Sequence, residues 1–255
     1  MASSLRKKVI LVTGASRGLG KAVALRCAKD GATLLLCARS KKKPFTTSVE
    51  GTLQSVAEQV RVLGGTPFMY QTDISDLGSV QKMVTSVKKT HTHIDAVVNN
   101  ASSLYIGGDV KIQNTILDVN LKGTLNVIES TKGLLAAGNL KHILTVSPPI
   151  ATFSPQWAVP HPPYTLSKYG MSLLTLGYSK DFNANTLWPH KLYKTAAVQR
   201  LERQSRKGLY STALDPSVFA AAVHKILCTN DLTGISFLDS DLVDLPPGGT
   251  EDVFV

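Results

Sequence analysis

Short apolar segments recur along the chain, separated by longer amphipathic or polar segments. The apolar segments are rich in Val, Ile and Leu and predict strands at 9–13, 33–38, 67–72, 94–99, 142–146, 186–188 and 235–238. Strands that are apolar on both faces are typical of a parallel sheet buried between two layers. The pattern therefore predicts a central parallel sheet of about seven strands.

The segments between the strands have helical spacing. Leu19, Ala22, Val23 and Cys27 share one face of a helix, and further helices are predicted near 47–63, 76–90, 112–136, 165–182 and 216–228. Alternating strands and helices predict right-handed crossovers and a doubly wound Rossmann α/β fold, with helices on both faces of the sheet. We find no internal repeat and no linker, so residues 1–255 are expected to form one domain.

Three segments are predicted to be irregular. Residues 40–51 form a polar, basic loop, and residues 148–163 carry six prolines, which we expect to exclude regular helix. The acidic tail 239–255 is expected to be loose.

Composition excludes several classes of protein. Hydrophobic residues make up 43% of the 255 positions and charged residues 18%, which excludes a disordered chain. No apolar run approaches the ~18 residues of a membrane span, and no secretory signal is visible. A cytoplasmic location is expected, with mitochondrial and peroxisomal locations left open. Cys27, Cys37 and Cys228 lack metal-ligand spacing, so no metal is predicted.

The net charge of +10 is concentrated near the N-terminus, because residues 1–43 hold 11 Lys/Arg and one acid, Asp30. Nucleic-acid binding is one interpretation of such a patch. The basic residues surround a glycine-rich turn, which favours instead a pocket for a phosphorylated cofactor. Lys41, Lys42 and Lys43 can also belong to a solvated loop. We expect no nucleic-acid partner.

That turn lies between the first predicted strand and the first predicted helix. Residues 13–20 read Thr-Gly-Ala-Ser-Arg-Gly-Leu-Gly, so the segment offers Gly14, Ser16, Arg17, Gly18, Leu19 and Gly20. Glycines permit a tight turn and close approach of a pyrophosphate, while the helix presents free N–H groups and the positive end of its dipole. The segment is therefore a candidate dinucleotide site.

The end of the second strand bears on the choice of nicotinamide cofactor. An acid at that position binds the ribose 2′-hydroxyl of NAD, whereas a basic residue accommodates the 2′-phosphate of NADP. Here the strand ends in Ala38-Arg39-Ser40, and Arg17 lies in the turn. Two guanidinium groups suit a phosphate, so NADP(H) is predicted. The alternative is that Arg39 points into solvent.

Four residues form a candidate catalytic set. Tyr164 and Lys168 are four residues apart and share a helix face. A free phenol has a pKa of ~10, and a nearby ammonium favours the phenolate. Ser147 follows the strand 142–146 and can hold a substrate oxygen. Asn120 can anchor a water that relays protons to the lysine. These residue types suit the reduction of a carbonyl or the oxidation of an alcohol.

In this order the motifs resemble the classical short-chain dehydrogenase/reductase family over residues 8–240. The spacing Thr-Gly-x-x-x-Gly-x-Gly, Asn99-Asn100-Ala101, Ser147 and Tyr-x-x-x-Lys carry the resemblance. Ser102, the prolines after Ser147 and Leu187-Trp188-Pro189 are most similar to the hydroxysteroid dehydrogenase-like proteins of the type 2 group. Members of that group often have a sterol-carrier domain; this sequence has none, so lipid handling by that domain is not carried over.

The resemblance implies further cofactor contacts. Asp73, followed by Ile74, would contact the adenine, although an aspartate there can also cap a helix. Asn100 and Ala101 would face the cofactor, and Lys168 would hold its ribose. Pro189 would precede a threonine for the nicotinamide amide. Lys191 occupies the usual threonine position, which leaves Thr195 as a second candidate. The segment before strand six is shortened near 183–185, which either trims a loop or truncates the strand.

The sequence thus predicts an NADP(H)-dependent oxidoreductase for a carbonyl/alcohol pair. Phe153, Trp157 and Val159 in the proline-rich loop suggest an apolar, lipid-like substrate, or else they pack that loop. The resemblance implies a homodimer or homotetramer built on two long helices, one of them carrying Tyr164. A dinucleotide-binding protein with little turnover, serving as a sensor or scaffold, is the main alternative. An enoyl reductase is a weaker one, because such enzymes do not normally keep the serine.

Overall fold

All strands of the sheet are parallel, as the apolar segments predict. In the computed structural model, which describes residues 4–39, 51–105, 109–159, 161–204 and 208–246, seven strands follow the order β3-β2-β1-β4-β5-β6-β7. Their bounds are β1 Val9–Thr13, β2 Thr33–Ala38, β3 Thr66–Gln71, β4 Ala96–Asn99, β5 His142–Val146, β6 Asn183–Trp188 and β7 Ser236–Leu238. This is the doubly wound Rossmann arrangement predicted from the sequence.

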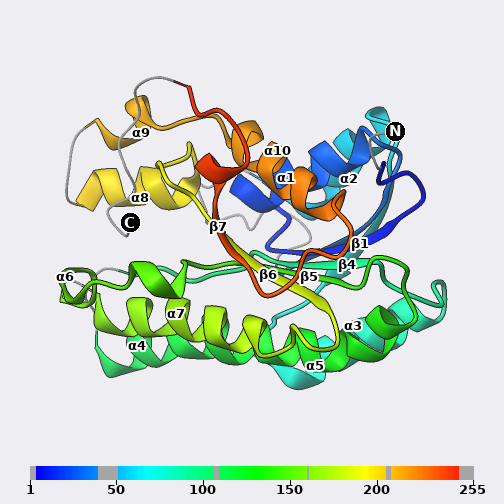
Figure 1. Cartoon of the computed structure of the whole chain (residues 1–255), viewed down its shortest axis with the longest axis horizontal. Coiled ribbons are helices and arrows are strands. Elements are labelled where there is room, and N and C mark those ends of the chain that lie inside the picture. Colours follow the sequence, from blue (N-terminus) through cyan, green and yellow to red (C-terminus); the bar gives the residue numbers. More distant parts are fainter. Residues whose placement is uncertain (1–3, 40–50, 106–108, 160, 205–207, 247–255) are drawn as a thin grey trace.

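Helices cover both faces of the sheet (Figure 1). One face carries α1 Gly18–Ala28, α2 Leu53–Val62 and α10 Pro216–Leu227; the other carries α3 Leu77–Lys88, α4 Val110–Leu117, α5 Gly123–Ala136 and α7 Pro162–Leu176. Alternation along β1 supplies both cores, because Ile10 and Val12 pack in one apolar cluster and Val9 and Leu11 in the other.

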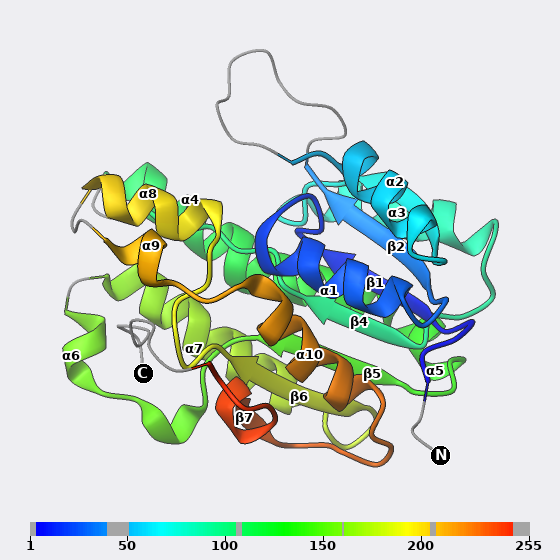
Figure 2. The same cartoon turned by 90° about the horizontal axis from the view of Figure 1, so that it is seen from above.

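Two short helices, α8 Ala196–Gln204 and α9 Leu209–Thr212, lie beyond the carboxyl ends of the strands (Figure 2). The sequence predicts no bounds for them; the basic segment after Pro189, with Arg200 and Arg203, is typical of a solvated helix face, with a site for a carboxylate or CoA-type anion as the less favoured alternative. Both helices pack on a small apolar cluster of Leu192, Val198 and Ala213, which is separate from the two main cores. In an open α/β sheet, ligands bind in the crevice outside this edge, so these helices stand where a ligand would be covered.

Several predicted boundaries were wrong. The helix predicted at 112–136 is interrupted by a π-helical turn, Asp118–Lys122, and the helix predicted at 165–182 runs instead from Pro162 to Leu176. The proline-rich loop contains a 3₁₀ turn, Ile150–Thr152, and a short helix, α6 Pro155–Ala158, because proline is tolerated in the first turn of a helix.

The acidic tail is not loose at its start. Asp239 begins a 3₁₀ turn, Asp239–Asp241, and its side chain is fully buried. Lys41, Lys42 and Lys43, most of the predicted loop 40–51, residues 47–50 of the predicted helix and the end of the tail lie outside the described residues. No helix among the described residues is long and apolar enough to cross a membrane.

Candidate active site

The glycine-rich turn is tied to the end of β4 by Asn100. The Asn100 side chain donates to the carbonyl oxygen of Thr13 at 2.9 Å, and the hydroxyl of Thr13 accepts from the backbone N–H groups of Asn100 and Ala101 at 3.0 Å each. Gly14 has φ +67°, and a Cβ there would lie 2.9 Å from the Cα of Ala101. The backbone therefore requires glycine and leaves an open cradle above it.

The first turn of α1 faces this cradle without a capping side chain. Arg17 precedes the helix in an extended conformation and makes no side-chain cap, and the first turn carries no acid. The first N–H groups of a helix have no intrahelical partner and carry a partial positive charge. The turn is thus built to receive an anion such as a pyrophosphate.

Positive charge gathers at one end of the site. Arg17 and Arg39 line the same cavity, and neither forms an ion pair among the residues that the structure describes. Burial lowers the pKa of Arg17, and the neighbouring charges of Arg39 and Arg200 lower it further. Arg39 itself is exposed, so its contact with a phosphate stays a prediction; a phosphate between the two guanidinium groups would relieve the repulsion between them.

Asp73 lies at the same end of the cavity, after β3. Its carboxylate accepts from the backbone N–H and hydroxyl of Ser75, at 3.0 and 2.6 Å. The cap of α3 is Asp76, which accepts from the N–H of Gly78 at 2.9 Å. The helix-cap alternative for Asp73 is therefore wrong, whereas its contact with an adenine stays a prediction.

Tyr164 and Lys168 line the cavity from α7, one turn apart; Lys168 contacts β5, which is separated by β4 from β1 and β2, the strands before Arg17 and Arg39. Both are buried, with exposed fractions of 8% and 3%. The ammonium of Lys168 donates to the carbonyl oxygen of Val146 at 2.7 Å and lies 5.2 Å from the centre of the Trp188 ring. A buried ammonium on the same helix face as a phenol favours the phenolate, as acid/base work by Tyr164 requires.

Ser147 is fully buried at the end of β5, and its hydroxyl oxygen has no hydrogen-bond partner among the described residues. A buried hydroxyl without a hydrogen-bond partner lowers the stability of a protein. Such a group is therefore expected where a ligand supplies the missing partner. Ser147 lies behind the surface of the cavity, next to Val146, which does line it.

Asn120 lies in the π-helical turn, a feature frequent at functional sites. Its side chain accepts from Ser103 N and Ser102 Oγ, and donates to Ser103 O and to Ser167 Oγ at 2.9 Å. These bonds occupy the amide on both sides, so it has no group left for a water. A proton relay through Asn120 stays a prediction. In such a relay the water would bind the backbone carbonyl oxygen of Asn120, which also accepts from Thr124 Oγ1.

The segment after β6 lines another part of the cavity. β6 begins at Asn183 and pairs with β5 from its first residue, so the shortened segment trims a loop and leaves the strand whole. Pro189, Lys191 and Thr195 all line the cavity. A Cβ on Gly18 would lie 3.4 Å from Thr195 Cγ2, so Thr195 faces the glycine-rich turn. The Lys191 ammonium donates to the carbonyl oxygen of Pro246 at 3.3 Å.

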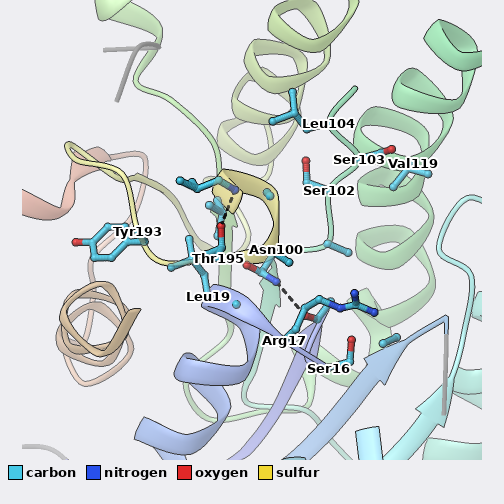
Figure 3. Close-up of a pocket in the computed structure, with 18 of the residues that line it drawn as sticks. Ser16, Arg17, Leu19, Asn100, Ser102, Ser103, Leu104, Val119, Tyr193 and Thr195 are labelled. Carbon is cyan, nitrogen blue, oxygen red and sulfur yellow. Dashed lines mark hydrogen bonds between the residues drawn. The ribbon is translucent and has the colours of Figure 1, made fainter. Parts of the chain in front are cut away.

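Together these residues enclose one cavity of about 470 Å³. Figure 3 shows Ser16, Arg17 and Leu19 on one side of it and Ser102, Ser103 and Leu104 on another. Most predicted cofactor residues line it, namely Gly14, Ser16, Arg17, Gly18, Leu19, Arg39, Asp73, Ile74, Asn100, Ala101, Pro189 and Thr195. Gly20 lies below the surface, packed against Gly14 and Asn100.

Sequence reasoning missed part of the lining. Tyr105, from the loop after β4, and Leu192, Tyr193, Val198 and Arg200, around α8, border the cavity. Phe153 and Val159 do not; Phe153 packs edge-on against Tyr169 instead. The Trp157 side chain lies outside the described part of the chain.

A second polar cluster lies away from the cavity, between α1 and α10. Asp30, His224 and Cys228 bring potential metal ligands within reach of one another. Arg26, however, donates to Asp30 at 2.9 Å and to His224 Nδ1 at 3.1 Å, and His224 Nε2 donates to Asp30 at 2.8 Å. An arginine can only donate, so His224 Nδ1 accepts and Nε2 carries the proton that is donated to Asp30. The carboxylate and both ring nitrogens therefore already have hydrogen-bond partners. The predicted absence of a metal stays a prediction.

The fold, with its glycine-rich turn at the carboxyl end of β1, is of the Rossmann type. The model of the short chain dehydrogenase family matches residues 8–187, and the chain belongs to this family. It is 34% identical to mouse Hydroxysteroid dehydrogenase-like protein 2 over 211 residues, covering 78% of this chain and 42% of the mouse protein. The resemblance to the type 2 group is therefore confirmed. The chain spans about half the length of the curated relatives it matches.

Solved structures agree with this assignment. A crystal structure from Xanthomonas campestris superposes with a TM-score of 0.88 at 30% identity and covers 99% of both chains. A short chain dehydrogenase from Mycobacterium thermoresistibile gives a TM-score of 0.87 at 31% identity, with 99% of this chain and 96% of that chain covered.

Proposed function

We propose that this chain is an NADP(H)-dependent oxidoreductase that interconverts a carbonyl and an alcohol on an apolar, lipid-like substrate. The single observation that supports the proposal is that one cavity is lined both by Tyr164 and Lys168, next to β5, and by Arg17 and Arg39, which follow β1 and β2 and form no described ion pair. More distant proteins of the same fold have been solved with NAD or with NADP, so the choice between them rests on these arginines.

The residues fit a dinucleotide along the cavity. The Gly14 cradle and the N-terminus of α1 would hold the pyrophosphate, and Arg17 and Arg39 the 2′-phosphate. Asp73 and Ile74 would flank the adenine, and Asn100 and Ala101 would line the path to the nicotinamide. Pro189 and Thr195 would border the nicotinamide amide.

A nicotinamide bordered by Pro189 and Thr195 would supply or accept a hydride at the substrate carbon. In the direction of reduction, the carbonyl oxygen takes the phenolic proton of Tyr164, and the ammonium of Lys168 stabilises the phenolate left behind. The Ser147 hydroxyl donates to the same oxygen, which satisfies a group otherwise without a partner. Oxidation reverses these steps.

The lining also supports an apolar substrate, although through residues other than those predicted. Leu104, Tyr105, Leu192, Val198 and Leu201 border the cavity. Apolar walls with a few polar groups are typical of small-molecule sites. The alternative of a cofactor-binding protein without turnover rested on a truncated sixth strand, and β6 has its full length.

The first test compares NADPH and NADH binding by tryptophan fluorescence and thermal shift in wild type, Arg39→Ala and Arg61→Ala. Trp188 lines the cavity and serves as the reporter, and the exposed Arg61 on α2 is the matched control. We expect wild type and Arg61→Ala to prefer NADPH by about tenfold or more and Arg39→Ala to lose that preference. Equal binding of both cofactors to wild type would reject the NADP(H) assignment.

A carbonyl screen with NADPH then tests turnover, with Tyr164→Phe as the matched variant. We expect turnover of an apolar ketone or aldehyde that Tyr164→Phe abolishes. Tight NADPH binding with no Tyr164-dependent turnover would favour the sensor or scaffold.

A further inference from the structure

Arg200 brings a third guanidinium group to the cavity. It lies on α8 and lines the cavity together with Arg17 and Arg39. Its Cζ lies 5.7 Å from the centre of the Tyr105 ring, so the guanidinium rests on a residue of the loop after β4. None of the described ion pairs involves Arg200.

The start of α8 approaches the glycine-rich turn, since a Cβ on Gly18 would lie 3.4 Å from Thr195 Cγ2. The charges of Arg39 and Arg200 both act on Arg17, where they add to burial in lowering its pKa. Asp73 also lines the cavity, but it accepts from Ser75 and forms no described ion pair with these arginines. Like charges held near one another cost free energy that a bound anion recovers. The cluster is therefore suited to a dianion held between the turn and α8.

An anion bound by Arg200 would matter for the position of α8, because few apolar contacts hold this helix. Apart from its cavity residues, α8 is held by the small cluster of Leu192, Val198 and Ala213 and by packing against α9, and it contributes nothing to the two main cores. Elements with few buried apolar contacts open at a low free-energy cost. A charge-assisted bond from Arg200 can therefore change how firmly α8 covers the cavity.

We propose that Arg200 is a positioning and specificity residue for the cofactor: it binds the 2′-phosphate of NADP(H) with Arg17 and Arg39 and thereby holds α8 over the cavity. The inference rests on the proposed function, since it assumes NADP(H) in the cradle. Its consequence is that NADPH, but not NADH, orders the helix that carries the Val198 and Leu201 part of the substrate wall.

The test uses wild type, Arg200→Gln, Arg200→Lys and Arg203→Gln. Arg203 lies on the same helix, is exposed and does not line the cavity, so it is the matched control. Binding of NADPH, NADH, 2′-AMP and 5′-AMP is measured by fluorescence and calorimetry, and hydrogen exchange is followed in residues 196–204. Thermal unfolding confirms that each variant folds.

We expect Arg200→Gln to weaken NADPH and 2′-AMP by about tenfold or more and to leave NADH and 5′-AMP unchanged. Arg200→Lys should recover part of the loss, and Arg203→Gln should behave as wild type. NADPH should slow hydrogen exchange in residues 196–204 more than NADH does, and Arg200→Gln should abolish that difference.

The failures of the two proposals are distinguishable. If wild type does not prefer NADPH, the cofactor assignment and this inference both fall. If wild type prefers NADPH and Arg39→Ala loses the preference, while Arg200→Gln keeps it, only the role of Arg200 is overturned. An equal loss of NADPH and NADH in Arg200→Gln, or a change confined to the KM of an acidic substrate, would also overturn it and would assign Arg200 to a different anion.

Discussion

The ammonium of Lys168 lies 2.7 Å from the carbonyl oxygen of Val146, the residue that precedes Ser147. This bond joins α7 to the carboxyl end of β5 and fixes the buried cation beside the serine and one helical turn from Tyr164. Ser147, Tyr164 and Lys168 are thus held by β5 and α7 alone. Their relative positions therefore follow from how this helix packs on this strand.

Replacement of Lys168 should change the pH dependence of the reaction as well as its rate. Without the ammonium, the phenolate of Tyr164 is less favoured, so the pH at which alcohol oxidation becomes half-maximal should rise. We expect Lys168→Met to lower kcat by about a hundredfold or more and Lys168→Arg to restore part of it. The measurement is kcat/KM against pH for the three proteins. An unchanged pH profile in Lys168→Met would remove the lysine from the acid/base step.

Replacement of Ser147 should separate activity from stability. The Ser147 hydroxyl has no partner among the described residues, so its loss removes no protein hydrogen bond. We expect Ser147→Ala to unfold within about 1 kcal/mol of wild type. Its kcat should nevertheless fall by about a hundredfold, because the substrate oxygen loses a donor. Urea unfolding and steady-state kinetics on one preparation test both. A large loss of stability would mean that the serine has a structural role.

Two glycines with left-handed backbones allow a matched test of the cradle. Gly14 has φ +67° and packs against Asn100 and Ala101, whereas Gly64 has φ +91° with nothing within 4 Å of an added Cβ. Gly64→Ala should cost about 1 kcal/mol of unfolding free energy from backbone strain alone and leave NADPH binding unchanged. Gly14→Ala should cost more and weaken NADPH by at least tenfold, as titrations of both variants would show. Equal NADPH affinities would contradict a cradle at Gly14.

The centre of the sheet could be predicted because β1, β2, β4 and β5 are buried on both faces and rich in apolar residues. β6 shows where that signal fails, since Asn183 and Asn185 read as loop. Their side chains are satisfied across the fold: Asn183 donates to the carbonyl oxygen of Leu140, and Asn185 donates to that of Leu232 and accepts from the N–H of Ile235. Such partners are distant in the sequence, and no local pattern shows them.

The cradle and the Tyr164–Lys168 pair could also be predicted, because a glycine-rich turn and an i, i+4 pair are local. Tyr105 and Arg200 could not, since their place at the cavity depends on how the loop after β4 and α8 pack. Asp239 was missed for the same reason. It is buried because it accepts from Tyr193 and from the N–H of His190, both brought to it by the path of the chain after β6.

The exposed leucines of α7 predict how the protein assembles. Leu166 and Leu173 are 62% and 61% exposed on the helix that carries Tyr164, and α5 exposes Leu125 on the same side of the sheet (Figure 1). Exposed apolar side chains on helices of one face favour an interaction site there, in line with the homodimer or homotetramer that the resemblance implies. Light scattering should show an oligomer for wild type and smaller species for Leu166→Arg/Leu173→Arg. Val62→Arg, also at an exposed apolar position, should remain assembled. A wild-type monomer would reject this interface.

The Asp30 cluster should make stability depend on pH in a defined direction. Burial raises the pKa of Asp30, but hydrogen bonds from His224, the Leu5 N–H and Arg26 outweigh it and lower the pKa to about 2. A group whose pKa falls on folding stabilises the protein above its unfolded pKa of ~3.9, and that stabilisation disappears as the pH drops through the folded value. Asp30→Asn should therefore cost about 1–3 kcal/mol of unfolding free energy at pH 7 and clearly less near pH 2.5. Urea unfolding at the two pH values measures the difference. Asp181→Asn, at an exposed position, should cost little at either. An equal cost of Asp30→Asn at both pH values would mean that the carboxylate charge contributes nothing and that the cluster acts by packing alone.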